Sequence, residues 1–177
     1  MKIFEDVFSG DEVLSDALEI HLDESKSIIS VMSKMIVPDD GGNVDIGCSN
    51  HFGGDEKEEG GDDGVEKVNN IIENFQLEEY FASKKDMMSI FKDKIAEVKE
   101  RLKDRPDRLK EWAADGAVSK FVKGVFGKFD DCKFYMGKSY GSSDPTEGML
   151  IISYWVKDED SGETFFYFKD CLREVKV

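Results

Sequence analysis

The sequence predicts an α+β fold in a single domain over residues 1–177, in which a helical hairpin is inserted into a β-sheet. Three observations predict this fold. Strand-like segments occupy both ends of the chain, a glycine-rich acidic stretch follows the first strands, and a long segment with helical periodicity precedes the last strands. With 177 residues, of which 40% are hydrophobic, one such domain can bury a sizeable core.

The first part of the chain is predicted to form β-strands. Residues 1–8, "MKIFEDVF", alternate in a way that places Ile3 and Val7 on one face of a strand. Residues 11–22 indicate a turn followed by a second extended segment. Residues 25–38 are rich in β-branched side chains and end at a proline, which favours a further strand. We therefore expect β-structure to open the chain.

Residues 39–66 are predicted to form a long, flexible and disordered acidic loop. The segment contains ten Asp or Glu residues and one Lys, a net charge of −9, together with many glycines. It is too polar to offset the conformational entropy that ordering would remove. The alternative is a calcium site, because Ca²⁺ takes several oxygen ligands; without an EF-hand pattern such a site would bind weakly. The candidate ligands are Asp55, Glu56, Glu58 and Glu59.

Residues 83–128 are predicted to form a helical hairpin, which follows a strand-like stretch at residues 68–82. Ser83 is a suitable residue to cap the first helix. The apolar residues after it recur at steps of three and four, the spacing of one helix face: Met88, Phe91, Ile95, Val98 and Leu102. Pro106 interrupts this helix and suits the first turn of the next one.

The last part of the chain returns to strand composition. Residues 132–137, 148–156 and 163–168 are rich in aromatic and β-branched side chains, and residues 158–162, "DEDSG", indicate a hairpin turn between the last two. The final residues, "LREVKV", alternate like a short strand. Strands therefore flank the helical hairpin on both sides.

The charges of the chain are unevenly distributed. The whole chain has a formal net charge of −15, yet residues 84–128 contain thirteen Lys or Arg against eight Asp or Glu, a net of +5. Two interpretations remain open. The cations can simply solvate an amphipathic helix through pairs one turn apart, or they can form a docking surface for an acidic partner. The overall negative charge and the lack of RNA-binding or zinc-finger patterns argue against nucleic acid.

Composition also limits the class of protein. No apolar run is long enough to span a membrane and no secretion signal is present, so we expect a cytoplasmic location. The three cysteines cannot all pair and lack the close spacing of a disulfide framework, so we expect them to be reduced thiols. The acidic residues near the N-terminus have no nucleophile or histidine at a catalytic spacing. We therefore expect a monomer that is not an enzyme and needs no organic cofactor.

Four segments of the sequence carry a resemblance to a known family. "KIFEDVF…DEVLSD", "FKDKIAEVKERLKDRPDR", "FDDCKFYMG" and "FFYFKDCLREVK" resemble the translationally controlled tumour protein family over the full length of the chain. The resemblance implies a β-tent fold, similar to the Mss4 and Rab-escort superfamily, with a projecting helical hairpin and a flexible acidic loop. It also implies an abundant cytosolic protein that binds calcium weakly, associates with tubulin or microtubules, and is tied to cell growth and survival.

The resemblance also implies functional residues. In the family, the helical hairpin is implicated in tubulin and calcium binding, which assigns a tubulin-binding role to Lys92, Lys94, Lys99, Arg101, Lys103, Arg105, Arg108 and Lys110. The alternative role is regulation of a Rheb-type small GTPase in the manner of an exchange factor, through Asp11 and Glu12. That role also uses a glutamate after the Y-M-G run, where this chain has Lys138. Such a charge reversal would repel the cation that the glutamate attracts.

Overall fold

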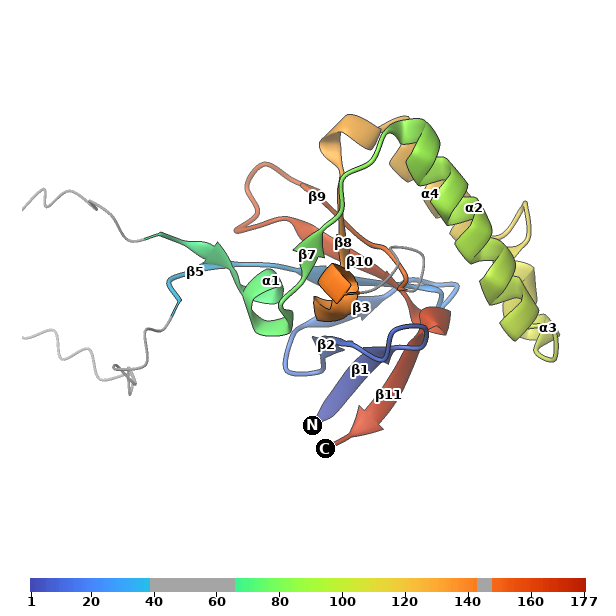
Figure 1. The fold of residues 1–177 in the computed structure, drawn as a ribbon, viewed down its shortest axis with the longest axis horizontal. Coiled ribbons are helices and arrows are strands. Elements are labelled where there is room, and N and C mark those ends of the chain that lie inside the picture. Colours follow the sequence, from blue (N-terminus) through green and yellow to red (C-terminus); the bar gives the residue numbers. More distant parts are fainter. Residues whose placement is uncertain (39–65, 143–147) are drawn as a thin grey trace, which may run out of the picture.

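The computed structural model describes residues 1–38, 66–142 and 148–177 (Figure 1). The predicted acidic loop lies outside the described residues except for Glu66, so its predicted disorder stays a prediction. Among the described residues, no helix is long and apolar enough to cross a membrane.

The strands form two main antiparallel sheets and one small one. The three-stranded sheet has the order β11 (Leu172–Lys176), β1 (Lys2–Asp6), β2 (Glu12–Ser15). The six-stranded sheet has the order β3 (Ile20–Leu22), β4 (Ile28–Met32), β10 (Thr164–Phe168), β9 (Ile151–Tyr154), β8 (Lys133–Met136), β7 (Glu78–Glu79). The small sheet pairs β5 (Met35–Ile36) with β6 (Val68–Asn69). The two termini therefore lie side by side, on β1 and β11 (Figure 1).

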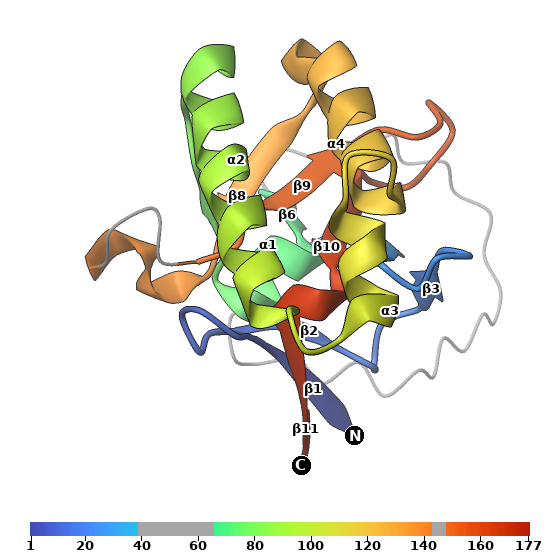
Figure 2. The ribbon, with the colours of Figure 1, turned by 90° about the vertical axis from the view of Figure 1, so that its right-hand side faces the viewer.

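The helices are inserted between strands, as predicted. The α-helices are α1 (Asn70–Phe75), α2 (Lys84–Arg101), α3 (Pro106–Leu109) and α4 (Ala117–Gly127). The 3-10 turns are η1 (Lys110–Trp112), η2 (Phe129–Asp131), η3 (Lys138–Ser142) and η4 (Lys169–Cys171). The elements α2 to α4 form the helical hairpin, and α2 and α4 lie side by side in front of the six-stranded sheet (Figure 2). The predicted α+β fold with an inserted helical hairpin is thus confirmed.

The central strand β10 of the six-stranded sheet is buried on both faces. On β10, Phe166 and Phe168 join the core that packs against the helical hairpin. Phe165 and Tyr167 point to the opposite face and join the core that includes Phe4 of the three-stranded sheet. The molecule is therefore built in three layers: hairpin, six-stranded sheet, and three-stranded sheet. Burial on both faces explains why the sequence of β10 is continuously apolar rather than alternating.

Helix α2 begins where the sequence predicts, but its buried face differs from the predicted one at one residue. The hydroxyl of Ser83 accepts a hydrogen bond from the Asp86 N–H (3.2 Å), so the predicted cap is confirmed. The structure buries Met87, however, and leaves Met88 half exposed. Met87 and Met88 stand four and three residues before the buried Phe91, and either spacing satisfies a helical pattern. The predicted apolar stripe was therefore wrong by one residue at its first position.

Two further expectations were only partly right. The second helix of the hairpin is divided into α3, η1 and α4; just before α4 the chain passes so close to the Glu111 carbonyl that a side chain on Gly116 would collide with it. Residues 68–82 contain the short helix α1 between two strands, since the Asn69 side chain accepts hydrogen bonds from the first N–H groups of that helix. On β1, the buried residues are Phe4 and Asp6, and Ile3 lies on the opposite face.

Candidate docking site on the helical hairpin

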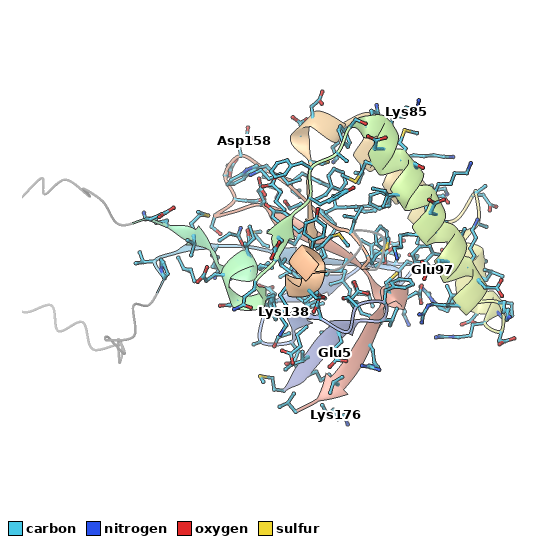
Figure 3. The ribbon with its side chains drawn as sticks, viewed as in Figure 1. Glu5, Lys85, Glu97, Lys138, Asp158 and Lys176 are labelled. Atoms are coloured by element: carbon cyan, nitrogen blue, oxygen red, sulfur yellow. The ribbon has the colours of Figure 1, made fainter. Side chains whose placement is uncertain are left out.

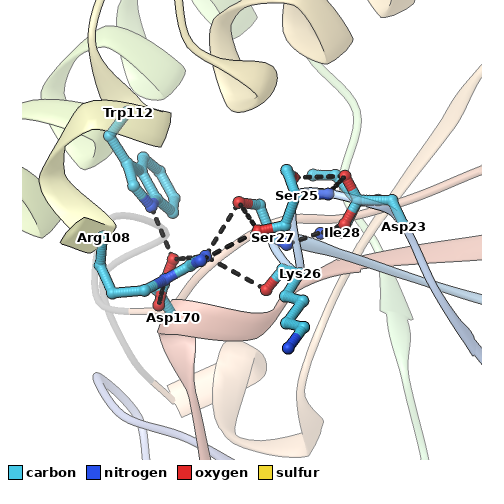
Figure 4. A network of polar contacts seen from close by, with 8 residues as sticks. All are labelled: Asp23, Ser25, Lys26, Ser27, Ile28, Arg108, Trp112 and Asp170. Carbon is cyan, nitrogen blue, oxygen red and sulfur yellow. Dashed lines mark hydrogen bonds and ion pairs between the residues drawn. The ribbon is translucent and has the colours of Figure 1, made fainter.

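The base of the hairpin is fixed to the sheets by Arg108. Its Nε donates to Asp170 Oδ1 (3.0 Å) and its Nη2 to Asp170 Oδ2 (2.8 Å), while Trp112 Nε1 also donates to Oδ2 (2.9 Å; Figure 4). The remaining guanidinium N–H groups bond to the turn at residues 25–27. The hydrogen bonds with Asp170 raise the pKa of Arg108. Because both side chains are largely buried, this pair joins three elements that are distant in the sequence.

The turn that receives Arg108 is itself held by Asp23. The carboxylate of Asp23 accepts from the N–H groups of Ser27 and Ile28, each at 2.8 Å. It also accepts from the hydroxyl of Ser25 (Figure 4). Partial burial alone would raise the pKa of Asp23, but these hydrogen bonds outweigh it and the pKa is lowered. The carboxylate therefore presets the turn for the guanidinium.

A second pair of cations holds α2 against the N-terminal segment. Lys94 is 3% exposed, and its Nζ lies 3.2 Å from Glu97 Oε2 and 4.3 Å from the centre of the Phe8 ring. The Arg101 guanidinium lies 4.7 Å from the centre of the same ring. Cations over an aromatic face are attracted by the ring quadrupole. Lys94 and Arg101 therefore contribute to packing inside the molecule.

Asp6 lies below this contact, at the end of β1. Its carboxylate accepts from the N–H groups of Phe8 (2.8 Å) and Met149 (2.7 Å). Burial raises the pKa of Asp6, although these hydrogen bonds and the charge of Lys94 act in the opposite direction. A buried carboxylate thus fixes the start of the segment that carries Phe8.

Of the remaining ten hairpin cations, two have a partner and eight, the free set, form no ion pair with a described residue. Lys103 forms an exposed ion pair with Glu100 (2.9 Å), and Lys128 lies over the ring of Tyr154. No ion pair with a described residue is formed by Lys84, Lys85, Lys92, Lys99, Arg105, Lys110, Lys120 or Lys123. Of the predicted tubulin-binding residues, Lys92, Lys99, Arg105 and Lys110 belong to this free set. The other four do not: Lys94 and Arg108 are largely buried and paired with carboxylates, Arg101 lies over the Phe8 ring, and Lys103 is paired with Glu100.

The fold holds the segment of Asp11 and Glu12, which carries the predicted GTPase contact, against the segment of Ser139. Asp11 is 6% exposed, and its Oδ2 accepts from the N–H (3.1 Å) and the hydroxyl (2.5 Å) of Ser139. A side chain on Gly137 would collide with that carboxylate. Glu12, at the start of β2, follows Asp11, and Lys138, at the start of η3, precedes Ser139; both side chains are exposed, and Lys138 is labelled in Figure 3. The Asp11 side chain is thus engaged inside the molecule, while Glu12 and Lys138, next to this contact in the chain, are exposed.

The predicted calcium ligands cannot be placed, because Asp55, Glu56, Glu58 and Glu59 lie outside the described residues. In the part of the chain that the structure describes, no group of three or more Asp, Glu, His or Cys residues could hold a metal ion. Weak calcium binding by the acidic segment therefore stays a prediction.

Sequence reasoning missed two features of this site. One is the partner of Arg108, which stands 62 residues further along the chain. The other is a groove between α2 and α4 that is lined by lysines and apolar residues of both helices. The many lysines of this segment are visible in the sequence. Which α2 side chains face the sheet and which face the groove depends on Met87 rather than Met88 being the buried methionine, and the sequence pattern did not show this.

The fold and site define an α+β protein whose helical hairpin is fixed by buried cations and presents a second, free set. Comparison with known proteins gives the family. A family model described as translationally controlled tumour protein matches residues 1–173, and the chain belongs to that family. Translationally controlled tumour protein homologues of Mycosarcoma maydis and Schizosaccharomyces pombe are 34% and 30% identical to it, over 100% and 99% of both chains respectively.

Solved structures agree with this assignment. The translationally controlled tumour-associated protein of Schizosaccharomyces pombe superposes with a TM-score of 0.75 at 29% identity, and each chain is covered completely. The translationally controlled tumour protein of Caenorhabditis elegans gives a TM-score of 0.67 at 21% identity, covering 100% of this chain and 99% of the other. The second comparison supports the fold alone.

Proposed function

We propose that this chain is an interaction protein that docks on acidic protein surfaces, and on tubulin and microtubules in particular, through the free cations of its helical hairpin. The observation that carries the proposal is the set of eight hairpin cations without an ion partner among the described residues, in a chain whose overall charge is −15. A patch of one sign attracts and orients a partner of the opposite sign, in a salt-dependent way. Tubulin tails are acidic, and the family resemblance supports the same partner.

Microtubule co-sedimentation across a salt series tests this proposal. The hairpin variant carries Lys92→Glu, Lys99→Glu and Lys110→Glu. The matched control carries Lys34→Glu, Lys157→Glu and Lys176→Glu, which changes the net charge equally at exposed positions outside the hairpin; Lys176, for example, lies near the end of β11, far from α2 (Figure 3).

We expect wild type and control to pellet with microtubules at low salt, and the hairpin variant to remain in solution. Pelleting should weaken as salt is added, because exposed charges are screened. Equal pelleting of both variants would remove the hairpin from the mechanism. Equal loss would show that only the net charge of the molecule matters. Circular dichroism of all three proteins checks that none has unfolded.

A second candidate function is regulation of a small GTPase, and one observation favours it. The hydrogen bonds between Asp11 and Ser139 hold together the two segments that carry Glu12 and Lys138, the positions that the family resemblance connects with a GTPase, and both of these side chains are exposed. Lys138 introduces a positive charge there, which opposes a cationic contact on the GTPase. The proposal therefore predicts weak activity that Lys138→Glu increases.

Release of a fluorescent nucleotide from a Rheb-type GTPase measures that activity. Wild type should accelerate release slightly, Lys138→Glu more strongly, and Glu12→Ala not at all. Glu19→Ala, at another exposed acidic position, serves as the control. If neither wild type nor Lys138→Glu accelerates release, this candidate function is excluded.

A further inference from the structure

The hairpin carries a groove whose chemistry goes beyond attraction of acidic surfaces. We infer that this groove, between α2 and α4, binds an amphipathic helix of a partner protein that has acidic residues along the edges of its apolar face. The groove has a volume of about 660 Å³ and lies between two helices that stand side by side (Figure 2). The inference extends the proposed function, because a purely acidic tail would use the lysines of the hairpin but not the apolar surface between them.

The floor of the groove is apolar and comes from both helices. Its apolar residues are Met88, Phe91, Ile95, Ala96, Val122 and Phe126. Phe91 and Phe126 are buried in the core below, whereas Met88 is 50% exposed. A methionine at such a place can adapt its shape to an incoming side chain. A partner that fills this floor gains from apolar burial, which charge alone does not provide.

The rim of the groove is positively charged. Lys84, Lys92 and Lys99 line it from α2, and Lys123 lines it from α4. The α2 lysines are separated by eight and seven residues, about two helical turns each, and so extend roughly 22 Å along the helix. None of the four lysines forms an ion pair with a described residue. The acidic residues of α2 are absent from the lining, so the rim is unbalanced and favours acids on the ligand.

A helix fits this arrangement better than an extended peptide. Apolar side chains at positions i, i+3 or i+4, and i+7 form a stripe that can enter a groove between two helices. Acidic residues two turns apart on its edge would match the spacing of Lys92 and Lys99. Small residues at Ala96 and Gly127 lower the walls of the groove, and a side chain added at Gly127 would meet no atom within 4 Å.

The test uses a fluorescent synthetic peptide of about 18 residues, five helical turns, with leucines on one face and glutamates on both flanks. One control peptide has the same composition in scrambled order, and another replaces every glutamate by lysine. Binding to the full-length protein is measured by fluorescence anisotropy. We expect the acidic amphipathic peptide to bind at least about tenfold more tightly than either control.

Two matched variants locate the binding site. Ala96→Trp fills the groove without changing a charge, and Ser89→Trp places the same side chain at an exposed α2 position that does not line the groove. We expect Ala96→Trp to weaken binding at least about tenfold and Ser89→Trp to leave it unchanged. Equal binding of the scrambled peptide, or an unaffected Ala96→Trp, would overturn the inference.

The same variants separate this inference from the tubulin proposal. If the peptide fails to bind while microtubules still pellet the wild-type protein, the groove inference alone fails. If the peptide binds in the groove and microtubules do not pellet the protein, the tubulin proposal alone fails. Binding of the wild-type protein to phosphatidylserine vesicles that Ala96→Trp abolishes, without peptide binding, would assign the groove to lipid and so overturn the inference.

Discussion

The helical hairpin uses the same types of residue in two different ways on its two sides. On the side toward the sheets, Arg108 and Lys94 are buried, paired with carboxylates, and hold the hairpin in place. On the side toward solvent, Lys92 and Lys99 have no ion partner among the described residues. The difference shows that the net charge of a segment combines two populations of cations, those paired inside the molecule and those exposed to solvent. Only the second population can attract a partner, while the first determines where that second set is presented.

The largest loss of stability is expected when Arg108, which fixes the base of the hairpin, is replaced. Arg108→Ala leaves Asp170 buried without its cation, and breaking a buried pair in this way costs about 3–5 kcal/mol. We expect the free energy of unfolding, measured in urea, to fall by about that amount. Arg105→Ala, at an exposed arginine three residues earlier that forms no ion pair with a described residue, should change it by less than about 0.5 kcal/mol. A small effect of Arg108→Ala would mean that the hairpin is held mainly by apolar packing.

Two substitutions of Lys94 test whether this residue stabilises the fold by its volume or by its charge. Lys94→Ala removes both the buried aliphatic stem and the contact with Phe8, so we expect a loss of about 2 kcal/mol of stability. Lys94→Met keeps most of the volume and should cost less than about 1 kcal/mol, because a buried ion pair is often replaceable by an apolar side chain.

Lys92→Ala completes this test on the free side. It should change stability by less than about 0.5 kcal/mol and weaken microtubule pelleting, whereas Lys94→Met should leave pelleting unchanged. Weaker pelleting with Lys94→Met and a folded protein would contradict the division into two populations.

The sequence predicted the parts of this structure that depend on neighbouring residues. Ser83 and Pro106 mark helix starts because their effects act within one helical turn. The strands around β10 were predicted from composition, but composition did not show which face of β1 is buried. Alternation alone cannot show that Asp6 points inward, since the N–H groups that satisfy its carboxylate include one from Met149, far along the chain.

The candidate site was harder to predict from the sequence, because it too depends on contacts between residues that are far apart in the chain. Arg108 and Arg105 look equivalent in the "RPDR" turn, yet only Arg108 meets Asp170, a residue on η4. Lys92 and Lys94 are two residues apart and lie on different sides of one helix, which decides that one is free and the other buried. A shift of one residue in the predicted stripe is enough to exchange these roles. Contacts with residues distant in the sequence, Phe8 for Lys94 and Asp170 for Arg108, therefore determine which cations are engaged inside the molecule.

The smallest effect concerns the pH dependence of stability at Asp6. Its pKa in the folded protein is raised above the ordinary value of 3.8 by burial, so the folded state holds the proton to higher pH than the unfolded state does. The contribution of Asp6 to the free energy of unfolding is therefore largest below pH 3.8 and declines as pH rises through the folded pKa.

Two variants isolate that contribution from the other carboxylates. Asp6→Asn cannot titrate, so the difference in stability between wild type and Asp6→Asn should shrink as pH rises from about 4 to 7. Lys94→Met removes a charge that lowers the Asp6 pKa, so its decline should extend to higher pH than that of wild type. Urea unfolding at several pH values measures both. Parallel pH profiles for all three proteins would mean that Asp6 titrates alike in the folded and unfolded states, and that Lys94 acts on the hairpin only through packing.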